Sequence, residues 1–263
     1  MQIFDSHTII SVIYALLSAI LPAMVWLYFW TREDTKNPEP KIMILIAFLG
    51  GVLAVFISLF FEKIIFNIDL NTIFSNQYIH PVLDFLKNIS IKKGLDISKV
   101  ALIIIFAPFI EELSKFIFAY GLVLRSKADD EPVDPMIYMI VTAIGFSAIE
   151  NMLFLIDPLL KNDFIFSIQT GNMRFIGATL LHTISSATIG FFMSVDFFDK
   201  KLHKFILTVF SVILAVVIHS LFNYFMIGSG QSTFIALEFI WVAVIIVLLA
   251  FEKIKKEKIE KIG

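Results

Sequence analysis

The 263-residue sequence contains no cysteine, which excludes disulfide bonds, thiolate metal ligands and a cysteine nucleophile. It is also poor in charge, because Asp, Glu, Lys and Arg together make up only 17% of the residues. A soluble domain usually carries about 25%. The 21 basic and 23 acidic side chains give a formal net charge of −2, so there is no basic excess for nucleic acid. We therefore expect neither a soluble domain nor a nucleic-acid partner.

Apolar residues are abundant instead: they make up 58% of the chain, and the mean hydropathy is +0.87. This much apolar surface needs a lipid bilayer as its solvent. A membrane-spanning helix needs about 20 mostly apolar residues, and a helix satisfies all its own backbone hydrogen bonds. The pattern predicts an all-α, polytopic transmembrane helix bundle with about seven spans. The predicted spans are residues 9–30, 41–61, 100–124, 136–156, 174–196, 204–226 and 233–251.

The distribution of Lys and Arg predicts the orientation of these spans. If the N-terminus is outside, the cytoplasmic segments 31–41, 125–135, 197–204 and 252–263 hold 13 Lys and Arg residues, against seven on the outer side. Basic residues accumulate on the cytoplasmic side of membrane proteins. We therefore expect a single integral membrane domain, N-out and C-in.

The segment 62–99 is predicted to be an outer-side loop that contains a short helix. Its apolar residues recur at helical spacing: Val82, Leu83, Phe85, Leu86 and Ile89. This spacing indicates an amphipathic helix lying on the outer membrane surface. An ordinary loop helix packed against the rest of the chain is the alternative.

Four of the predicted spans carry polar or ionisable residues, which are costly in lipid and therefore mark functional sites. They are Glu111, Glu112 and Lys115 in one span, Glu150 and Asn151 in the next, His182 in the third, and His219 and Asn223 in the fourth. A helix rises about 1.5 Å per residue, and with alternating directions these groups fall at similar depth, from the middle of the membrane to its outer half. The sequence therefore predicts one buried polar site from four helices.

Carboxylates and imidazoles gathered in this way can activate water. A carboxylate can act as a general base, and a neutral imidazole or an amide can stabilise an oxyanion. The same residue types can hold Zn²⁺, and the ligands would then come from Glu112, Glu150, His182 and His219. The residues fit a glutamate-only mechanism as well as a metal-dependent one. The zinc motif H-E-x-x-H and the serine motif G-x-S-x-G are both absent from the sequence.

Four sequence motifs resemble those of the PrsW-type intramembrane proteases. They are P-x-x-E-E-x-x-K at 108–115, Glu150-Asn151, Arg174 followed by His182, and H-x-x-x-N at 219–223, in order within a catalytic core 100–226. The resemblance implies an intramembrane endopeptidase that hydrolyses a peptide bond of membrane-anchored proteins near the outer leaflet. It further implies a place in a prokaryotic cell membrane and site-1 cleavage of a single-span anti-sigma factor in envelope stress signalling. We expect Arg174 itself to be an anchor at the membrane interface.

The PrsW family is similar to the CAAX prenyl endopeptidases, whose bundle also has a glutamate pair and H-x-x-x-N. This relation implies that Glu111 or Glu112 activates water, with His182, His219 and Asn223 as the other catalytic residues. Lys115, Glu150 and Asn151 are then expected to support these catalytic residues. The CAAX pattern has E-E-x-x-x-R, whereas here the lysine comes one residue sooner. A CAAX-type endopeptidase remains one alternative, and a proton-coupled transporter that uses the buried Glu/His/Lys cluster is another.

Overall fold

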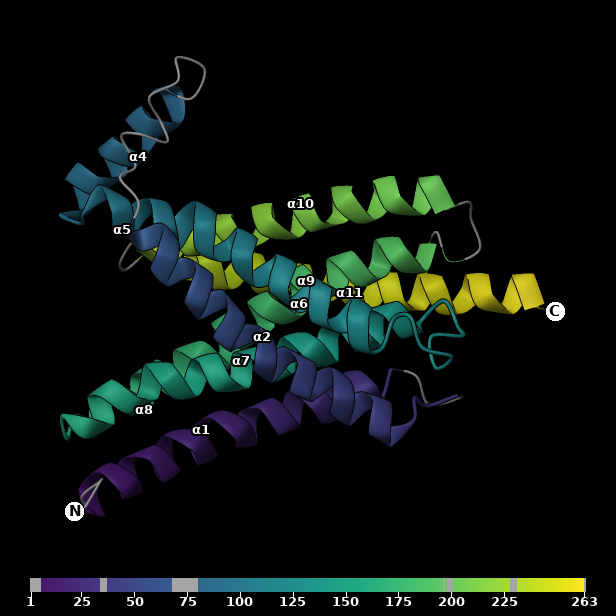
Figure 1. Cartoon of the computed structure of the whole chain (residues 1–263), viewed down its shortest axis with the longest axis horizontal. Helices are drawn as coiled ribbons and strands as arrows, with labels where there is room; N and C mark the ends of the chain where they lie inside the picture. Colours follow the sequence, from purple (N-terminus) through teal and green to yellow (C-terminus); the bar gives the residue numbers. More distant parts are fainter. Residues whose placement is uncertain are drawn as a thin grey trace.

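The computed structural model describes residues 6–33, 37–67, 80–195, 197, 201–227 and 231–262, with side chains for all of them except 80–83, 201 and 257–262. Every regular element in this part of the chain is a helix, and the helices form one bundle (Figure 1). They are α1 (Ser6–Thr31), α2 (Lys41–Phe66), α4 (His80–Lys93), α5 (Ile97–Ala101), η2 (Leu102–Phe106), α6 (Ala107–Leu122), α7 (Asp134–Leu160), α8 (Phe164–Met173), η3 (Arg174–Ala178), α9 (Thr179–Val195), α10 (Lys201–Ile227) and α11 (Gln231–Ile262).

Six helical stretches in the described residues are long and apolar enough to cross a membrane. They are α1, α2, α7, the continuous α8–η3–α9 stretch, most of α10 and residues 231–256 of α11. The prediction of an all-α polytopic bundle is confirmed. A seventh span at 100–124 and the N-out orientation stay predictions.

The predicted span at 100–124 is a composite helix in the structure. It consists of α5, the wide π-turn η2 and α6, and the backbone N–H of Ala107 bonds to the carbonyl of Leu102, five residues earlier. Pro108 explains the wide turn, because proline has no N–H and its ring clashes with the carbonyl four residues before it. The turn therefore lies one helical turn before Glu111 and Glu112.

The structure shows two helical segments within the loop predicted at 62–99. Helix α2 continues to Phe66, so Glu62 belongs to a helix and not to the loop predicted at 62–99. The helix predicted inside that loop exists as α4, and its Leu86 and Ile89 are buried against Val100. Helix α4 thus packs against α5, whereas its placement on the membrane surface stays a prediction.

Helix α7 lies at the centre of the bundle, where it contacts α1, α2 and α9. Glycines allow the closest of these contacts. A Cβ atom on Gly51 would lie 1.9 Å from the carbonyl oxygen of Thr142, and one on Gly145 would lie 2.0 Å from that of Phe48. Small residues of this kind let membrane helices approach backbone to backbone. The close contact fixes α2 beside α7 and thereby sets two walls of the site described below.

Replacing Gly145 with leucine should therefore force α2 and α7 apart and destabilise the protein by about 1–3 kcal/mol or more, the usual cost of overpacking. The measurement is thermal unfolding of the purified protein in detergent micelles. Gly121→Leu is the matched control, because a Cβ on Gly121 meets nothing within 4 Å. Equal unfolding temperatures for the two variants would contradict the close helix contact.

Candidate active site and metal centre

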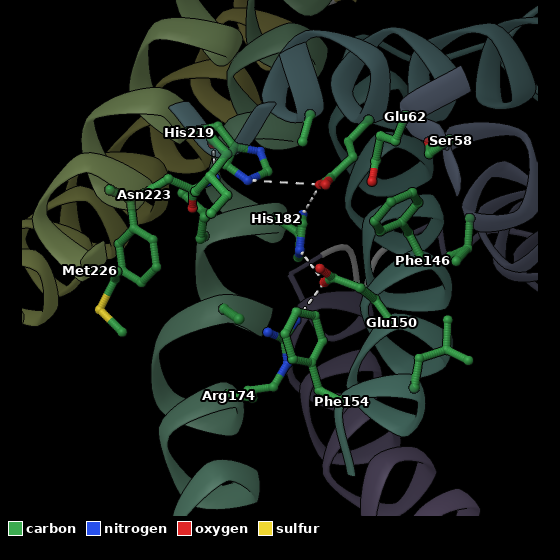
Figure 2. A pocket seen from close by; sticks show the side chains of 18 of the residues that line it. Ser58, Glu62, Phe146, Glu150, Phe154, Arg174, His182, His219, Asn223 and Met226 are labelled. Atoms are coloured by element: carbon green, nitrogen blue, oxygen red, sulfur yellow. Dashed lines mark hydrogen bonds and ion pairs between the residues drawn. The ribbon is translucent and has the colours of Figure 1, made fainter. Parts of the chain in front are cut away.

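The ionisable side chains of the four predicted spans meet in one place. Glu111 and Glu112 come from α6, Glu150 from α7, His182 from α9 and His219 from α10. The two imidazole rings lie edge to face with their centroids 5.0 Å apart. Figure 2 shows Glu150, His182 and His219 around a common cavity, which Glu111 also lines. The structure thus brings together the acidic and imidazole groups that the sequence places on separate helices.

Glu112 is the fully buried anchor of the cluster. Its Oε1 lies 2.7 Å from Nζ of Lys115 and 2.8 Å from Nδ1 of His219, and it accepts a hydrogen bond of 2.8 Å from the hydroxyl of Ser185. A buried carboxylate is tolerated only when it is paired and hydrogen-bonded. Glu112 meets this condition, and it fixes the ring of His219 as a result.

His182 is held from both sides. Its Nδ1 lies 3.1 Å from Nζ of Lys115, and because an ammonium group only donates, Nδ1 is the acceptor. The proton of the neutral ring is therefore on Nε2, which donates to Oε2 of Glu150 at 2.8 Å. Nδ1 of His182 is left as the nitrogen whose lone pair faces the centre of the cluster.

Arg174 completes the support of Glu150. Its guanidinium group donates to Oε2 of Glu150 and to Oδ1 of Asn151, each at 2.6 Å, and lies 3.8 Å from the centre of the Phe154 ring. Asn151 in turn donates to the hydroxyl of Thr179 at 2.9 Å. These contacts make Arg174 part of the site, whereas we expected an interfacial anchor from the sequence.

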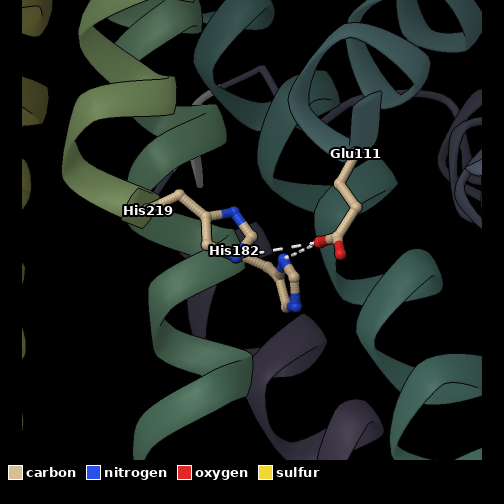
Figure 3. A group of neighbouring side chains, drawn as sticks. All are labelled: Glu111, His182 and His219. Carbon is tan, nitrogen blue, oxygen red and sulfur yellow. Dashed lines mark ion pairs between the residues drawn. The ribbon is translucent and has the colours of Figure 1, made fainter. Parts of the chain in front are cut away.

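Three side chains point toward one common centre: Glu111, His182 and His219 (Figure 3). Oε2 of Glu111 lies 3.8 Å from Nδ1 of His182 and 3.7 Å from Nε2 of His219, and the three atoms all lie within 4.8 Å of one another. Ligand atoms around a tetrahedral zinc ion are about 3.4 Å apart. The spacing is close to that of a metal site.

A second observation supports a metal at this centre: Oε2 of Glu111 is buried and has no hydrogen-bond partner. Such an atom is rare in a folded protein. In both imidazoles, the nitrogen that faces away from the centre is hydrogen-bonded to a carboxylate. Nε2 of His182 is hydrogen-bonded to Glu150, and Nδ1 of His219 to Glu112. Metal-binding histidines are typically held in this way. The residues present therefore fit a metal ion, which would replace the hydrogen bond between Lys115 and His182.

This geometry changes the ligand set that the sequence suggested. Glu112 and Glu150 were expected among the ligands, but each lies behind an imidazole and is occupied by a cation, Lys115 or Arg174. Glu111 takes their place beside the two histidines. Neighbouring residues on a helix point about 100° apart, so only one member of the Glu111–Glu112 pair can face the centre.

Asn223 lies on α10 one turn after His219 and lines the same cavity. Its amide donates to the backbone carbonyl of Ile103 in η2 at 2.9 Å. The amide is therefore close to the predicted catalytic residues, and its donor is held by the wide turn that Pro108 causes.

The cavity in front of these residues has a volume of about 460 Å³. Its walls come from α2, η2, α6, α7, η3, α9 and α10 and are mainly apolar. Two wall residues were missed from the sequence, Ser58 and Glu62 of α2. A signal was present, because Gly51, Ala54, Ser58 and Glu62 follow one another at spacings of three and four, which places them on one helix face.

A polytopic helix bundle with a buried Glu–His–His centre beside an apolar cavity defines the class of membrane-embedded hydrolases. Residues 39–251 match the family model of the PrsW family intramembrane metalloproteases, and this range contains every site residue described above. The chain belongs to this family, and it is an intramembrane protease.

Two curated relatives agree with this assignment. The chain is 24% identical to Protease PrsW of Geobacillus kaustophilus over 219 residues, which cover 83% of this chain and 82% of the relative. It is 21% identical to Protease PrsW of Clostridioides difficile over 248 residues, which cover 93% and 90%. No solved structure matches the chain.

Proposed function

We propose that this intramembrane protease is zinc-dependent and cleaves single-span, membrane-anchored proteins close to the outer membrane surface. The observation that carries the proposal is the convergence of Glu111, His182 and His219 on one centre beside the cavity. The family's description as metalloproteases supports a metal, and the Glu–His–His donor set is one that zinc accepts.

The proposed ligands are Oε2 of Glu111, Nδ1 of His182 and Nε2 of His219. When bound, zinc polarises a peptide carbonyl and makes water more acidic. The surrounding residues keep the ligands in place: Glu150 and Glu112 orient the two rings, and Lys115 balances the charge of Glu112.

The remaining steps belong to side chains of the cavity. The second carboxylate oxygen of Glu111 accepts a proton from water as that water attacks the peptide carbonyl, which is the role of a general base. The same carboxyl group then gives this proton to the amine nitrogen as the peptide C–N bond breaks. The amide of Asn223 leaves the carbonyl of Ile103 and donates to the developing oxyanion. The apolar walls hold the peptide segment and keep bulk water away from these groups.

The side of cleavage follows from the position of the cavity along the helices. Its wall includes Glu62 near the end of α2, Arg174 at the start of η3, and Ile227 at the end of α10. With the predicted N-out orientation, these three residues lie in the outer halves of their helical stretches. An anti-sigma factor that is anchored by one span and cut at site 1 during envelope stress is the substrate class that we propose.

Cleavage of purified single-span substrates tests the proposal. The protein is reconstituted in liposomes with zinc and a panel of bacterial single-span proteins, anti-sigma factors included, and the products are sized by mass spectrometry. We expect cleavage of some substrates within or next to the outer end of their span, and loss of cleavage after chelation. Cleavage confined to the inner end would contradict the proposed orientation, and cleavage unaffected by chelation would contradict the metal.

A further inference from the structure

The wall of the cavity opposite the histidines carries a carboxylate that the proposed chemistry does not use. Glu62 and Ser58 lie one turn apart on α2 and both line the cavity. Figure 2 shows them across the cavity from His219 and Asn223. Their helix, α2, supplies none of the proposed metal ligands, so Glu62 and Ser58 have no part in the metal centre.

Glu62 differs from the other acidic groups of the site in having neither a cation nor an imidazole paired with it. Glu112 is paired with Lys115, Glu150 with Arg174, and Glu111 lies against two imidazoles. Among the residues that the structure describes, Glu62 has neither an ion pair nor a hydrogen bond, and the charged groups acting on it are other carboxylates, Glu150 and Glu111. In the described part of the chain, the carboxylate on this wall of the cavity therefore has no cation to balance its charge.

Ser58 supplies an independent sign of a missing ligand. Its side chain is 1% exposed, and its hydroxyl has no hydrogen-bond partner. A buried polar atom without a partner is destabilising, and native structures contain few of them. A group that bound between Ser58 and Glu62 would satisfy both side chains.

We propose that Glu62 and Ser58 form a subsite for a basic side chain, Lys or Arg, of the substrate near the cleaved bond. A cation compensates the charge of Glu62, which a neutral donor cannot do. An ammonium or guanidinium group has three or more N–H donors, enough for the carboxylate and the hydroxyl together. The neighbouring wall residues Val55, Leu59 and Phe146 are apolar and suit the aliphatic stem of such a side chain.

The inference rests on the proposed function only in taking a peptide segment as the occupant. The substrate class becomes narrower as a result: a membrane-anchored protein with a Lys or Arg close to the cleavage point. Glu62 acts here as a specificity residue, so its loss should change which peptide is cleaved and leave the chemistry intact.

Cleavage of probe peptides tests the subsite. The probes are fluorogenic single-span peptides in detergent micelles, with Arg, Lys, Gln or Glu placed in turn at each position near the outer end of the span. We expect the wild-type protein to cleave the best Arg or Lys peptide at least 10-fold more efficiently, in kcat/KM, than its Gln counterpart. Glu62→Gln should bring the two within about twofold of each other, and Glu62→Arg should favour the Glu peptide. Ser58→Ala should reduce the preference partly.

Glu238→Gln is the matched control, because Glu238 is an exposed carboxylate of α11 outside the cavity. This variant should keep the wild-type preference. A wild-type protein that cleaves Arg, Gln and Glu peptides equally would overturn the subsite and leave the protease proposal standing. So would an equal loss for every peptide in Glu62→Gln, since that result would place Glu62 in the chemistry or the fold.

Binding of the same peptides separates the subsite from catalysis. Fluorescence anisotropy of labelled Arg and Gln peptides should show at least 10-fold tighter binding of the Arg peptide, lost in Glu62→Gln. This difference would support the subsite even if no peptide were cleaved, whereas failure of cleavage alone would count against the proposed function. Equal affinities for the two peptides would overturn the subsite.

Discussion

Replacing His219 with alanine is expected to abolish both zinc binding and peptide cleavage. The variant removes one of three proposed ligands and also leaves Glu112 without one of its hydrogen bonds. Changes in groups that only orient a metal ligand already cost about 10–100-fold in metal affinity or activity. Loss of the ligand itself should therefore reduce both by about 100-fold or more. Glu150 orients His182 and pairs with Arg174 without being a proposed ligand. Glu150→Gln should therefore reduce zinc affinity and cleavage by about 10–100-fold.

Metal content and cleavage rate have to be measured on the same preparation. Zinc per protein is determined by mass spectrometry after purification and equilibration with zinc, and cleavage is followed with a substrate that the wild-type protein cuts. His203→Ala is the control, because His203 is exposed and lies on the same helix, near its other end. If His219→Ala kept its zinc and lost only cleavage, a glutamate-only mechanism would replace the metal-dependent one.

The sequence predicts the bundle well because lipid leaves few choices to the chain. A long apolar run in a bilayer has to be a helix, and an ionisable residue in such a run has to face away from lipid. This is enough to predict that Glu112, Glu150, His182 and His219 lie close together. The sequence also predicts the pairing of Glu112 with Lys115, since residues three apart share a helix face.

The roles within the cluster depend on packing that a single sequence does not encode locally. Whether Glu111 or Glu112 faces the centre depends on how α6 is rotated, and the π-turn η2 before Pro108 changes that rotation. Which nitrogen of His182 carries the proton is determined by Lys115 on one helix and Glu150 on another. Both facts follow from long-range contacts and appear only in the structure.

Arg174 and Glu62 show the same limit at the ends of spans. Charged residues at a predicted membrane boundary are usually interfacial, and both were interpreted in that way, one as an anchor and one as part of a loop. Helix α2 and the α8–η3–α9 stretch continue past the predicted boundaries, and each brings its charge to the cavity. The hydropathy pattern indicates where contact with lipid ends. A helix can extend beyond that point when other helices pack against it, so the pattern does not give the end of the helix.

Replacing Lys115 with methionine is expected to destabilise the protein strongly. The ammonium group is completely buried between Glu112 and His182 and lies 5.1 Å from the centre of the Phe146 ring. Its removal leaves the carboxylate of Glu112 buried without a cation, and breaking such a pair on one side costs about 3–5 kcal/mol. Unfolding in detergent micelles, by heat or denaturant, measures the loss.

A double variant separates the buried charge from the loss of packing. Lys115→Met combined with Glu112→Gln removes both charges, so it should recover most of the stability while the orientation of His219 and the activity stay impaired. Lys161→Met is the control, because the Lys161–Asp157 pair is 70% and 71% exposed and should contribute less than about 1 kcal/mol. A double variant as unstable as the single one would mean that Lys115 stabilises the bundle by packing.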